Sequence, residues 1–430
     1  MANRQGAGKP HPGSLVVGIL SACLCAAATS AQANTDISAG LDTRFTDNAR
    51  KTSSNETSDM ETRAYVTAGY RSDPGRCNAD FSGTLGYAYW HDSTFDNESY
   101  GEMTFNGDCE LANRLYWDVS NNLREVSQDG RQSDTPDNRT RKNVFSTGPR
   151  YLLRLSDTNW LNLSGRYENT EFSEPEETDS ERYLGTAAWN HLFSKTLTGG
   201  LSASFSRTEY DTGAEVDVKT ARVTFAKTWA TTQLSGSLGV SDIETRFGNT
   251  TQTSDGLVGE LEINRKVTES LDWYLRGARE LTDRTSTFDF RFDEFEFNLR
   301  DSISVETSTV STGFDQRFSN RSTLNVNVYA SQADYLQSPE REDRSGLNAR
   351  YSRPITELVS GYARVGFNYT KFQSDQVDDR QLRLEVGADY RASRDMSLVA
   401  KVGHESKTSD APNREYDENW ILVGLEYRFR

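Results

Sequence analysis

The sequence is poor in aliphatic residues, cysteine and histidine, and it carries no excess of basic charge. Hydrophobic residues make up 35% of its 430 residues, and the formal net charge is −16. A chain this acidic is a poor candidate for a nucleic-acid binder, which needs a basic face. Aromatic residues are nevertheless plentiful, with 19 Tyr, 20 Phe and 7 Trp, and this argues against a disordered chain. Among the hydrophobic residues, the aliphatic ones are therefore scarce and the aromatic ones are not. This composition is typical of a structure with only one apolar face.

Residues that commonly carry catalysis or bind metals are also scarce. Beyond residue 33 the histidines are His91, His191 and His404, and none has metal-ligand spacing with another His, Cys or carboxylate. The sequence has no Gly-x-Ser-x-Gly elbow and no phosphate-cradling Gly-Lys-Ser/Thr loop. We therefore expect no cofactor, no metal site and no enzymatic activity, although the many carboxylates leave a glycoside-hydrolysing pair open.

The N-terminus has the layout of a secretory signal peptide. Basic, polar MANRQGAGKPHPGS precedes apolar LVVGILSACLCAAA and then TSAQA. This pattern predicts a signal peptide over residues 1–33, cleaved after Ala33, and one mature domain over residues 34–430. The apolar run of about 14 residues is too short for a membrane-spanning helix. A lipoprotein box ending at Cys23 is the alternative. Loss of Arg4 and Lys9 takes the net charge from −16 to −18.

Two cysteines remain after cleavage, Cys77 and Cys109. They lie in successive predicted strands, so a disulfide could join the base of a hairpin. An exported chain meets oxidising conditions, which favours this bridge over two free thiols. The alternative is a pair of small residues on one sheet.

Alternation of apolar and polar residues runs along the whole mature chain. In NWLNLSGRYE, residues 159–168, the apolar positions Leu161, Leu163 and Tyr167 share one face. The same pattern recurs roughly every 20 residues without a helical interruption, so each unit reads as a strand with one apolar and one charged face.

Short and long connections alternate between these strands. The short ones are residues 155–159, 193–196, 267–270, 318–321 and 392–395, and the long ones are residues 46–58, 129–139, 173–180, 247–255, 337–342 and 408–414. This rhythm predicts an all-β fold, a transmembrane antiparallel up-and-down β-barrel of about 20 strands (range about 18–22) in the bacterial outer membrane, with short periplasmic turns and longer extracellular loops. A soluble sandwich, solenoid or propeller is the alternative, but strands of roughly 10–16 residues exceed the soluble norm.

If the apolar faces contact lipid, the charged faces line the lumen. The lumen-facing candidates are Arg150, Arg154, Arg166, Arg276, Arg364, Arg383, Glu168, Glu260, Glu262, Asp272, Glu385 and Asp389. One interpretation is mutual stabilisation of opposite charges on neighbouring strands. The other is a hydrated track that hydrogen-bonds an acidic or hydroxylated polymer.

Residues 288–298, FDFRFDEFEFN, set an aromatic against a polar residue at nearly every step. The slip at Asp293-Glu294 predicts a turn between two strands. We expect an extracellular aromatic hairpin that contains Phe288, Phe290, Phe292, Phe295 and Phe297. Its rings could form an aromatic girdle, pack on the loop itself, or stack on sugar rings at the channel mouth.

Two stretches carry resemblances. Gly424, Tyr427 and Phe429 near the C-terminus resemble the outer-membrane assembly signal, although Leu422 and the final Arg430 depart from its pattern. This implies recognition by the barrel-assembly machinery. FTDN at 45–48, PDNRT at 136–140 and STGP at 146–149 resemble the β-barrel porin 2 group, in particular the outer-membrane proteins associated with PEP-CTERM/exosortase and exopolysaccharide clusters.

That resemblance implies a channel or assembly factor for a secreted polysaccharide, with no active site. The expected function is therefore passive passage of an extracellular polysaccharide through a hydrated lumen, with outer-membrane lipid, the polymer and periplasmic export proteins as partners and without nucleic acid. The alternatives are a general small-solute diffusion porin and a plugged structural or adhesive barrel in an exopolysaccharide assembly complex.

Overall fold

The structure, a computed structural model, describes residues 34–174, 177–283, 290–292, 295–297, 304–336 and 338–429. The predicted signal peptide and lipoprotein box lie outside these residues. Among the described residues, no helix combines the length and apolar character that a membrane crossing requires.

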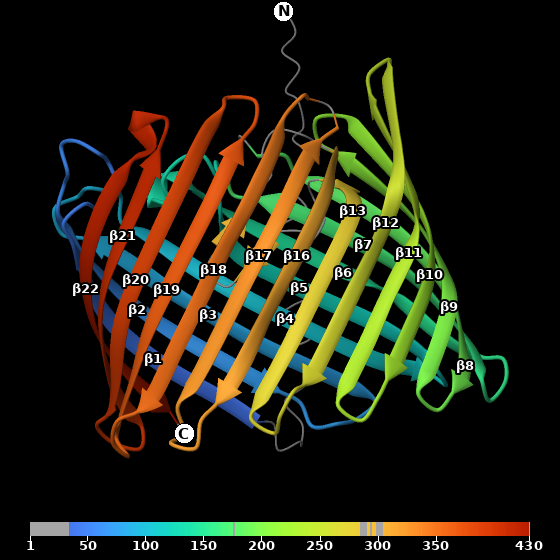
Figure 1. Ribbon diagram of the computed structural model, residues 1–430, viewed down its shortest axis with the longest axis horizontal. Helices are drawn as coiled ribbons and strands as arrows, with labels where there is room; N and C mark the ends of the chain where they lie inside the picture. The colour runs from blue at the N-terminus through green and yellow to red at the C-terminus, as the bar shows by residue number, and fades with distance from the viewer. Residues whose placement is uncertain are drawn as a thin grey trace, which may run out of the picture.

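Twenty strands form one closed antiparallel sheet (Figure 1). They are β1 (Asn34–Thr46), β2 (Asp59–Arg71), β3 (Cys77–Trp90), β4 (Glu98–Ala112), β5 (Leu115–Ser127), β6 (Arg139–Arg154), β7 (Asn159–Phe172), β8 (Ser180–Ser194), β9 (Leu197–Tyr210), β10 (Ala214–Thr228), β11 (Thr232–Phe247), β12 (Thr250–Lys266), β13 (Leu271–Asp283), β16 (Ser304–Arg317), β17 (Thr323–Tyr335), β18 (Arg341–Pro354), β19 (Val359–Phe372), β20 (Val377–Arg391), β21 (Met396–Ser409) and β22 (Tyr416–Phe429). Each pairs with its neighbours in the chain, and β22 pairs with β1 from Ile37↔Phe429 to Thr46↔Trp420. The predicted up-and-down barrel of about 20 strands is confirmed.

The outer face of the barrel is apolar although it is exposed. Large side chains project from it, such as Leu85 (69% exposed), Leu238 (65%) and Val423 (58%). Exposing such a side chain to water costs about 1.5–3 kcal/mol, so a surface that repeats this on every side requires lipid. Closure also gives each strand of the barrel a hydrogen-bonded neighbour on both sides and so leaves no open sheet edge, which a bilayer demands.

The two ends of the barrel differ. β1 begins and β22 ends at the end with the short turns, where Figure 1 marks the C-terminus. In outer-membrane barrels this end faces the periplasm. The predicted turns are present, for example at residues 267–270 and 392–395. Cys77 and Cys109 are directly opposite each other on β3 and β4 at this end and form a disulfide.

One sequence expectation about the extracellular end was wrong. Residues 247–255 are not a long loop, because β11 continues to Phe247 and β12 starts at Thr250, with Gly248 in the left-handed region (φ +57°) making a tight turn. The expected aromatic hairpin contains two short strands that pair with each other. β13 ends at Asp283, and β14 (Phe290–Phe292) pairs only with β15 (Phe295–Phe297) as a separate sheet.

Candidate functional site

The inner wall carries ion pairs that link neighbouring strands. Arg63 makes two hydrogen bonds to Asp42 at 2.9 and 3.2 Å, and Arg150 makes two to Asp118 at 2.9 and 3.0 Å. Bidentate pairs of this kind fix both side chains and leave few unsatisfied hydrogen-bonding groups. Among the described residues, no group of three or more His, Cys, Asp or Glu is placed to hold a metal ion.

The predicted lumen residues are spread over the wall and do not form a single site. Several are paired with other charged residues: Arg150 with Asp118 (2.9 Å), Arg276 with Glu262 (3.1 Å), Asp272 with Arg317 (2.8 Å), Glu168 with Arg182 (3.5 Å) and Arg154 with Asp157 of a periplasmic turn (2.7 Å). Glu260 accepts a hydrogen bond from Ser237, and Glu385 accepts one from Tyr362. Arg166 lines one cavity, Arg364, Arg383 and Glu385 line a second, and Asp389 lines a third.

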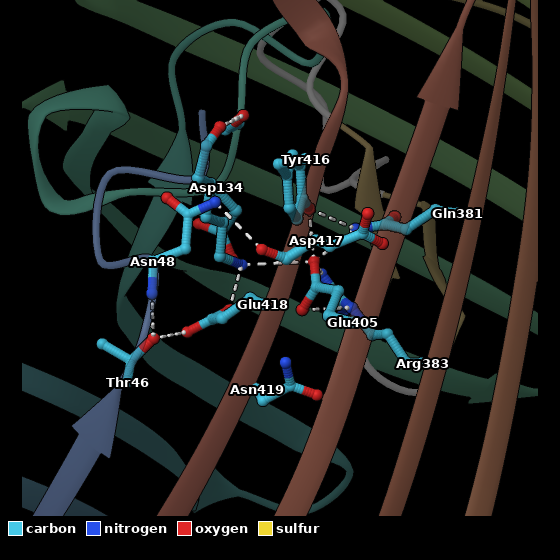
Figure 2. A network of polar contacts seen from close by, with 12 residues as sticks. Thr46, Asn48, Asp134, Gln381, Arg383, Glu405, Tyr416, Asp417, Glu418 and Asn419 are labelled. Atoms are coloured by element: carbon cyan, nitrogen blue, oxygen red, sulfur yellow. Dashed lines mark hydrogen bonds and ion pairs between the residues drawn. The ribbon is translucent and has the colours of Figure 1, made fainter. Parts of the chain in front are cut away.

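A buried charge network, here called the mouth network, lies toward the extracellular end (Figure 2). Its centre is Lys51, from the β1–β2 loop, whose Nζ lies 3.2 Å from Glu405 of β21 and 3.6 Å from Glu418 of β22. Glu418 is fully buried and Glu405 is 7% exposed. Because buried carboxylates need compensating partners, Lys51 ties this loop firmly to the wall.

Each glutamate has further partners from the wall. Glu418 accepts hydrogen bonds from Arg44 and Thr46 of β1, both at 2.6 Å. Glu405 is bound by Arg383 at 3.2 Å and by Gln381 at 2.7 Å, both of β20, and it accepts a short hydrogen bond from Tyr416. Figure 2 shows Thr46 of β1 beside Glu418, and Gln381 and Arg383 of β20 with Tyr416 of β22 beside Glu405.

Residues 128–138, here called the strap, join β5 to β6 and cross the extracellular mouth. Arg131 binds Glu340, in the β17–β18 connection, at 3.3 Å and Asp375, in the β19–β20 connection, at 3.6 Å. These connections lie on the opposite side of the ring from β5 and β6. Arg131 also lies over the buried ring of Phe372 at 5.3 Å, a cation–π contact. The strap therefore holds two facing walls together.

The strap also contacts the mouth network directly. Ser133 donates a hydrogen bond to the carbonyl of Lys51 at 3.2 Å, and Asp134 binds Arg139 at 2.9 Å. Burial among the inward-folded loops raises the pKa of Asp134, but the charge of Arg139 and its hydrogen bonds, with Lys51 and Arg383 farther away, hold that pKa well below its ordinary value. Many protein atoms lie around the Asp134 carboxylate and weaken its hydration. The space directly beside it is nevertheless open, so 43% of the side chain remains accessible.

Two of the sequence motifs explain why these loops turn inward. In FTDN, the buried Asn48 donates hydrogen bonds to the carbonyls of Thr52 and Asp417 at 2.8 and 2.9 Å. In PDNRT, residues Pro136–Asn138 form the short helix η1, and Asn138 binds Ser127, Asp129 and Ser133 of the strap. Each asparagine replaces a regular turn with side-chain hydrogen bonds.

Sequence reasoning missed Lys51, Arg131, Asp134, Glu405 and Glu418. Glu405 and Glu418 were detectable by their place on the polar face of their strands. Lys51, Arg131 and Asp134 lie in loops without periodicity, and their partners come from distant parts of the chain. Of the aromatic hairpin, Phe290, Phe292, Phe295 and Phe297 belong to β14 and β15, the second of which lies near β5, and Phe288 lies outside the described residues.

Comparison with known proteins gives one family match. Residues 347–429, from within β18 to the end of β22, match the family described as "Putative beta-barrel porin 2". No curated protein sequence matches the chain.

Among solved structures, the siderophore receptor PirA from Pseudomonas aeruginosa has 11% identity and a TM-score of 0.48, over 92% of this chain and 80% of that one. The outer membrane protein opdK from Pseudomonas aeruginosa has 9% identity and a TM-score of 0.40, over 92% and 99%. A loop-deletion mutant of OmpT, an outer membrane protein of Vibrio cholerae, has 11% identity and a TM-score of 0.36, over 93% and 100%.

The evidence for the class of this protein is its own architecture, a closed barrel with an apolar exterior and a charged interior, together with the family match at its C-terminal end. The protein is a porin-like β-barrel of the bacterial outer membrane.

Proposed function

We propose that this barrel is a passive passage through which an extracellular polysaccharide crosses the outer membrane. The observation that carries the proposal is the wall of paired arginines and carboxylates on successive strands, such as Arg63–Asp42 and Arg150–Asp118. A sugar polymer offers hydroxyl groups that both donate and accept hydrogen bonds, so it can exchange bonds with either partner of such a pair. Because the pairs largely neutralise one another, the polymer is not held by a strong net charge.

The strap refines this proposal. A loop that joins opposite walls across the mouth, through Arg131, Glu340 and Asp375, favours a passage that is closed at rest. A general diffusion porin would instead conduct steadily. Opening would then require the polymer or a periplasmic partner to push the strap aside, and the barrel itself needs no catalytic step and no cofactor.

The proposed role implies partners at each stage. Insertion would depend on the barrel-assembly machinery, which would read the C-terminal strand, and force on the polymer would come from periplasmic export proteins. The resemblance of FTDN, PDNRT and STGP to barrels associated with exopolysaccharide clusters supports this assignment.

A clean deletion strain tests the proposal. Carbohydrate would be measured outside the cell, in the periplasm and in the cytoplasm, beside a strain complemented with the wild-type gene. We expect loss of secreted polymer with accumulation inside the cell, and restoration on complementation. Unchanged secretion in the deletion strain would refute export. Single-channel recording of the purified protein then separates a diffusion porin, which conducts steadily, from a plugged structural barrel, which does not conduct.

A further inference from the structure

A polar cavity of about 530 Å³ lies in the wall formed by β3 to β7, toward the periplasmic end. Its lining includes Asp108 of β4, Asp118 and Ser120 of β5, Ser146 and Arg150 of β6, and Arg166 of β7. It is separate from the mouth network, none of whose residues lines it.

The STGP motif lies in the β6 segment beside this cavity. The antiparallel pairing of β6 with β7 runs to Thr147↔Tyr167 and resumes at Arg150↔Ser164, so Gly148 and Pro149 are skipped. Proline has no N–H to donate there. At Gly148 the two backbones approach so closely that an added Cβ would lie 2.0 Å from the carbonyl oxygen of Gly165. No side chain therefore lies between those of Ser146 and Arg150, which line the cavity from the same face of β6.

Two groups that line the cavity lack a protein partner. The side chain of Ser146 is 5% exposed, and its Oγ has no hydrogen-bond partner. This hydroxyl is covered by protein atoms, so it lies beneath the cavity surface and does not itself face a ligand. Within the described part of the chain, Arg166 has no ion-pair partner, whereas Arg150 is bound by Asp118 in two hydrogen bonds and Arg71 by Asp80.

The charges of the cavity define the ligand it would suit. Arg71, Arg150 and Arg166 face Asp80, Asp108 and Asp118 in the lining. Two of these arginines are neutralised by aspartates, which leaves the guanidinium of Arg166 for an external carboxylate. Among the residues that the structure describes, the Asp108 carboxylate accepts one hydrogen bond, from the amide of Asn78 at 3.4 Å, so it can still accept hydrogen bonds from hydroxyl groups. One carboxylate beside several hydroxyls is the pattern of a uronic acid.

We propose that this cavity is a subsite for one uronic acid unit of a polysaccharide, a proposal that rests on the proposed function and names its substrate class. Arg166 binds the sugar carboxylate, since a guanidinium matches a carboxylate in two parallel hydrogen bonds. Asp108 binds ring hydroxyls, and the sugar ring lies in the space between these two side chains. The cavity thus selects acidic polymers before they reach the strap.

Binding of sugar oligomers to the purified full-length protein in detergent tests the subsite. The probes are trigalacturonate and the neutral maltotriose, measured by titration calorimetry. We expect wild type to prefer trigalacturonate and Arg166→Gln to bind it about tenfold more weakly, with maltotriose unchanged, because a charge-assisted hydrogen bond is lost. Arg166→Lys should restore part of the affinity, and Asp108→Ala should weaken it by a smaller factor.

The control is Lys195→Gln, which removes a positive charge from the exposed β8–β9 turn and should leave binding as in wild type. Heat-modifiable mobility on gels confirms that each variant is folded. Equal affinity of wild type and Arg166→Gln for trigalacturonate, or a wild-type preference for maltotriose, would overturn the subsite. If the deletion strain still fails to secrete polymer, the export function stands without the subsite. If Arg166-dependent binding is found while the deletion strain secretes normally, the subsite stands and the export function fails.

Discussion

Asp134 is a single loop carboxylate whose ionisation helps to hold the strap in place. It lies among Arg139, Lys51 and Arg383, and these positive charges keep its pKa below the ordinary value despite its burial. A carboxyl group whose pKa is lowered in the docked strap stabilises docking fully above the pKa of the free strap. That stabilisation is lost as the pH falls through the lowered value.

Because the pKa of Asp134 is lowered in the docked strap, acid should weaken docking and open the channel. We expect the open probability in planar bilayers to stay constant from neutral pH down to about pH 5 and to rise below about pH 4, the ordinary range of an aspartate. Asp134→Asn should show a raised open probability at neutral pH and a smaller acid response. An open probability that falls on acidification, or an Asp134→Asn channel identical to wild type at every pH, would contradict this role.

At the scale of one element, the strap is held by partly exposed contacts that water or a ligand can replace. Arg131 is 24% exposed and Glu340 is 22% exposed, so their ion pair is worth about 1 kcal/mol at most. Reversing the charge in Arg131→Glu removes this attraction and adds repulsion, and it should raise the ratio of open to closed channels about fivefold. The measurement is single-channel recording at low salt.

A charge swap provides the control for this variant. Arg131→Glu combined with Glu340→Arg restores opposite charges across the mouth, and it should recover part of the closed population. The recovery is incomplete, because Arg131 also contacts Asp375 and the ring of Phe372. A double variant as open as the single one would show that the strap is not held by this pair.

The strands could be predicted from the sequence and the loops could not, for a physical reason. A strand between lipid and water must alternate apolar and polar residues with period two. The spacing of Leu161, Leu163 and Tyr167 therefore shows which face of their strand contacts lipid. Inward loops follow no such rule. The FTDN and PDNRT motifs were visible, but what Asn48 and Asn138 bind depends on how the backbone turns. The alternation predicts that Arg166 belongs to the polar face of its strand, whereas the cavity that it lines is built from residues of β2 to β7, whose combination the sequence pattern does not show.

At the scale of the whole molecule, the barrel is closed by the pairing of its last strand with its first, here called the seam. β22 pairs with β1 along ten positions, from Ile37↔Phe429 to Thr46↔Trp420. Tyr427 and Phe429 project from the outer face at the periplasmic end of this seam, 46% and 50% exposed, with their rings 5.2 Å apart. They are thus accessible to another protein before the seam has formed.

Removing the last aromatic residue should therefore impair assembly more than stability. We expect Phe429→Ser to lower the amount of heat-modifiable, folded barrel in outer-membrane fractions, while barrel refolded in detergent melts within a few degrees of wild type, since Phe429 is half exposed. Ile421→Ser, which removes an exposed apolar residue from the middle of the same strand, is the matched comparison. Equal membrane levels of Phe429→Ser and wild type would show that the terminal aromatic is not an assembly signal here.

The position of Lys51 has a consequence for the order of events during biogenesis. Its two glutamate partners lie on the last two strands of the chain, while Lys51 itself follows the first strand. Its anchorage therefore cannot form until the C-terminal strand has joined the N-terminal one, and the strap, which rests on the Lys51 backbone, gains that support only afterwards. The strap therefore docks fully only after insertion is complete. A barrel that stalls before its first and last strands pair would lack a docked strap, and its mouth would leak.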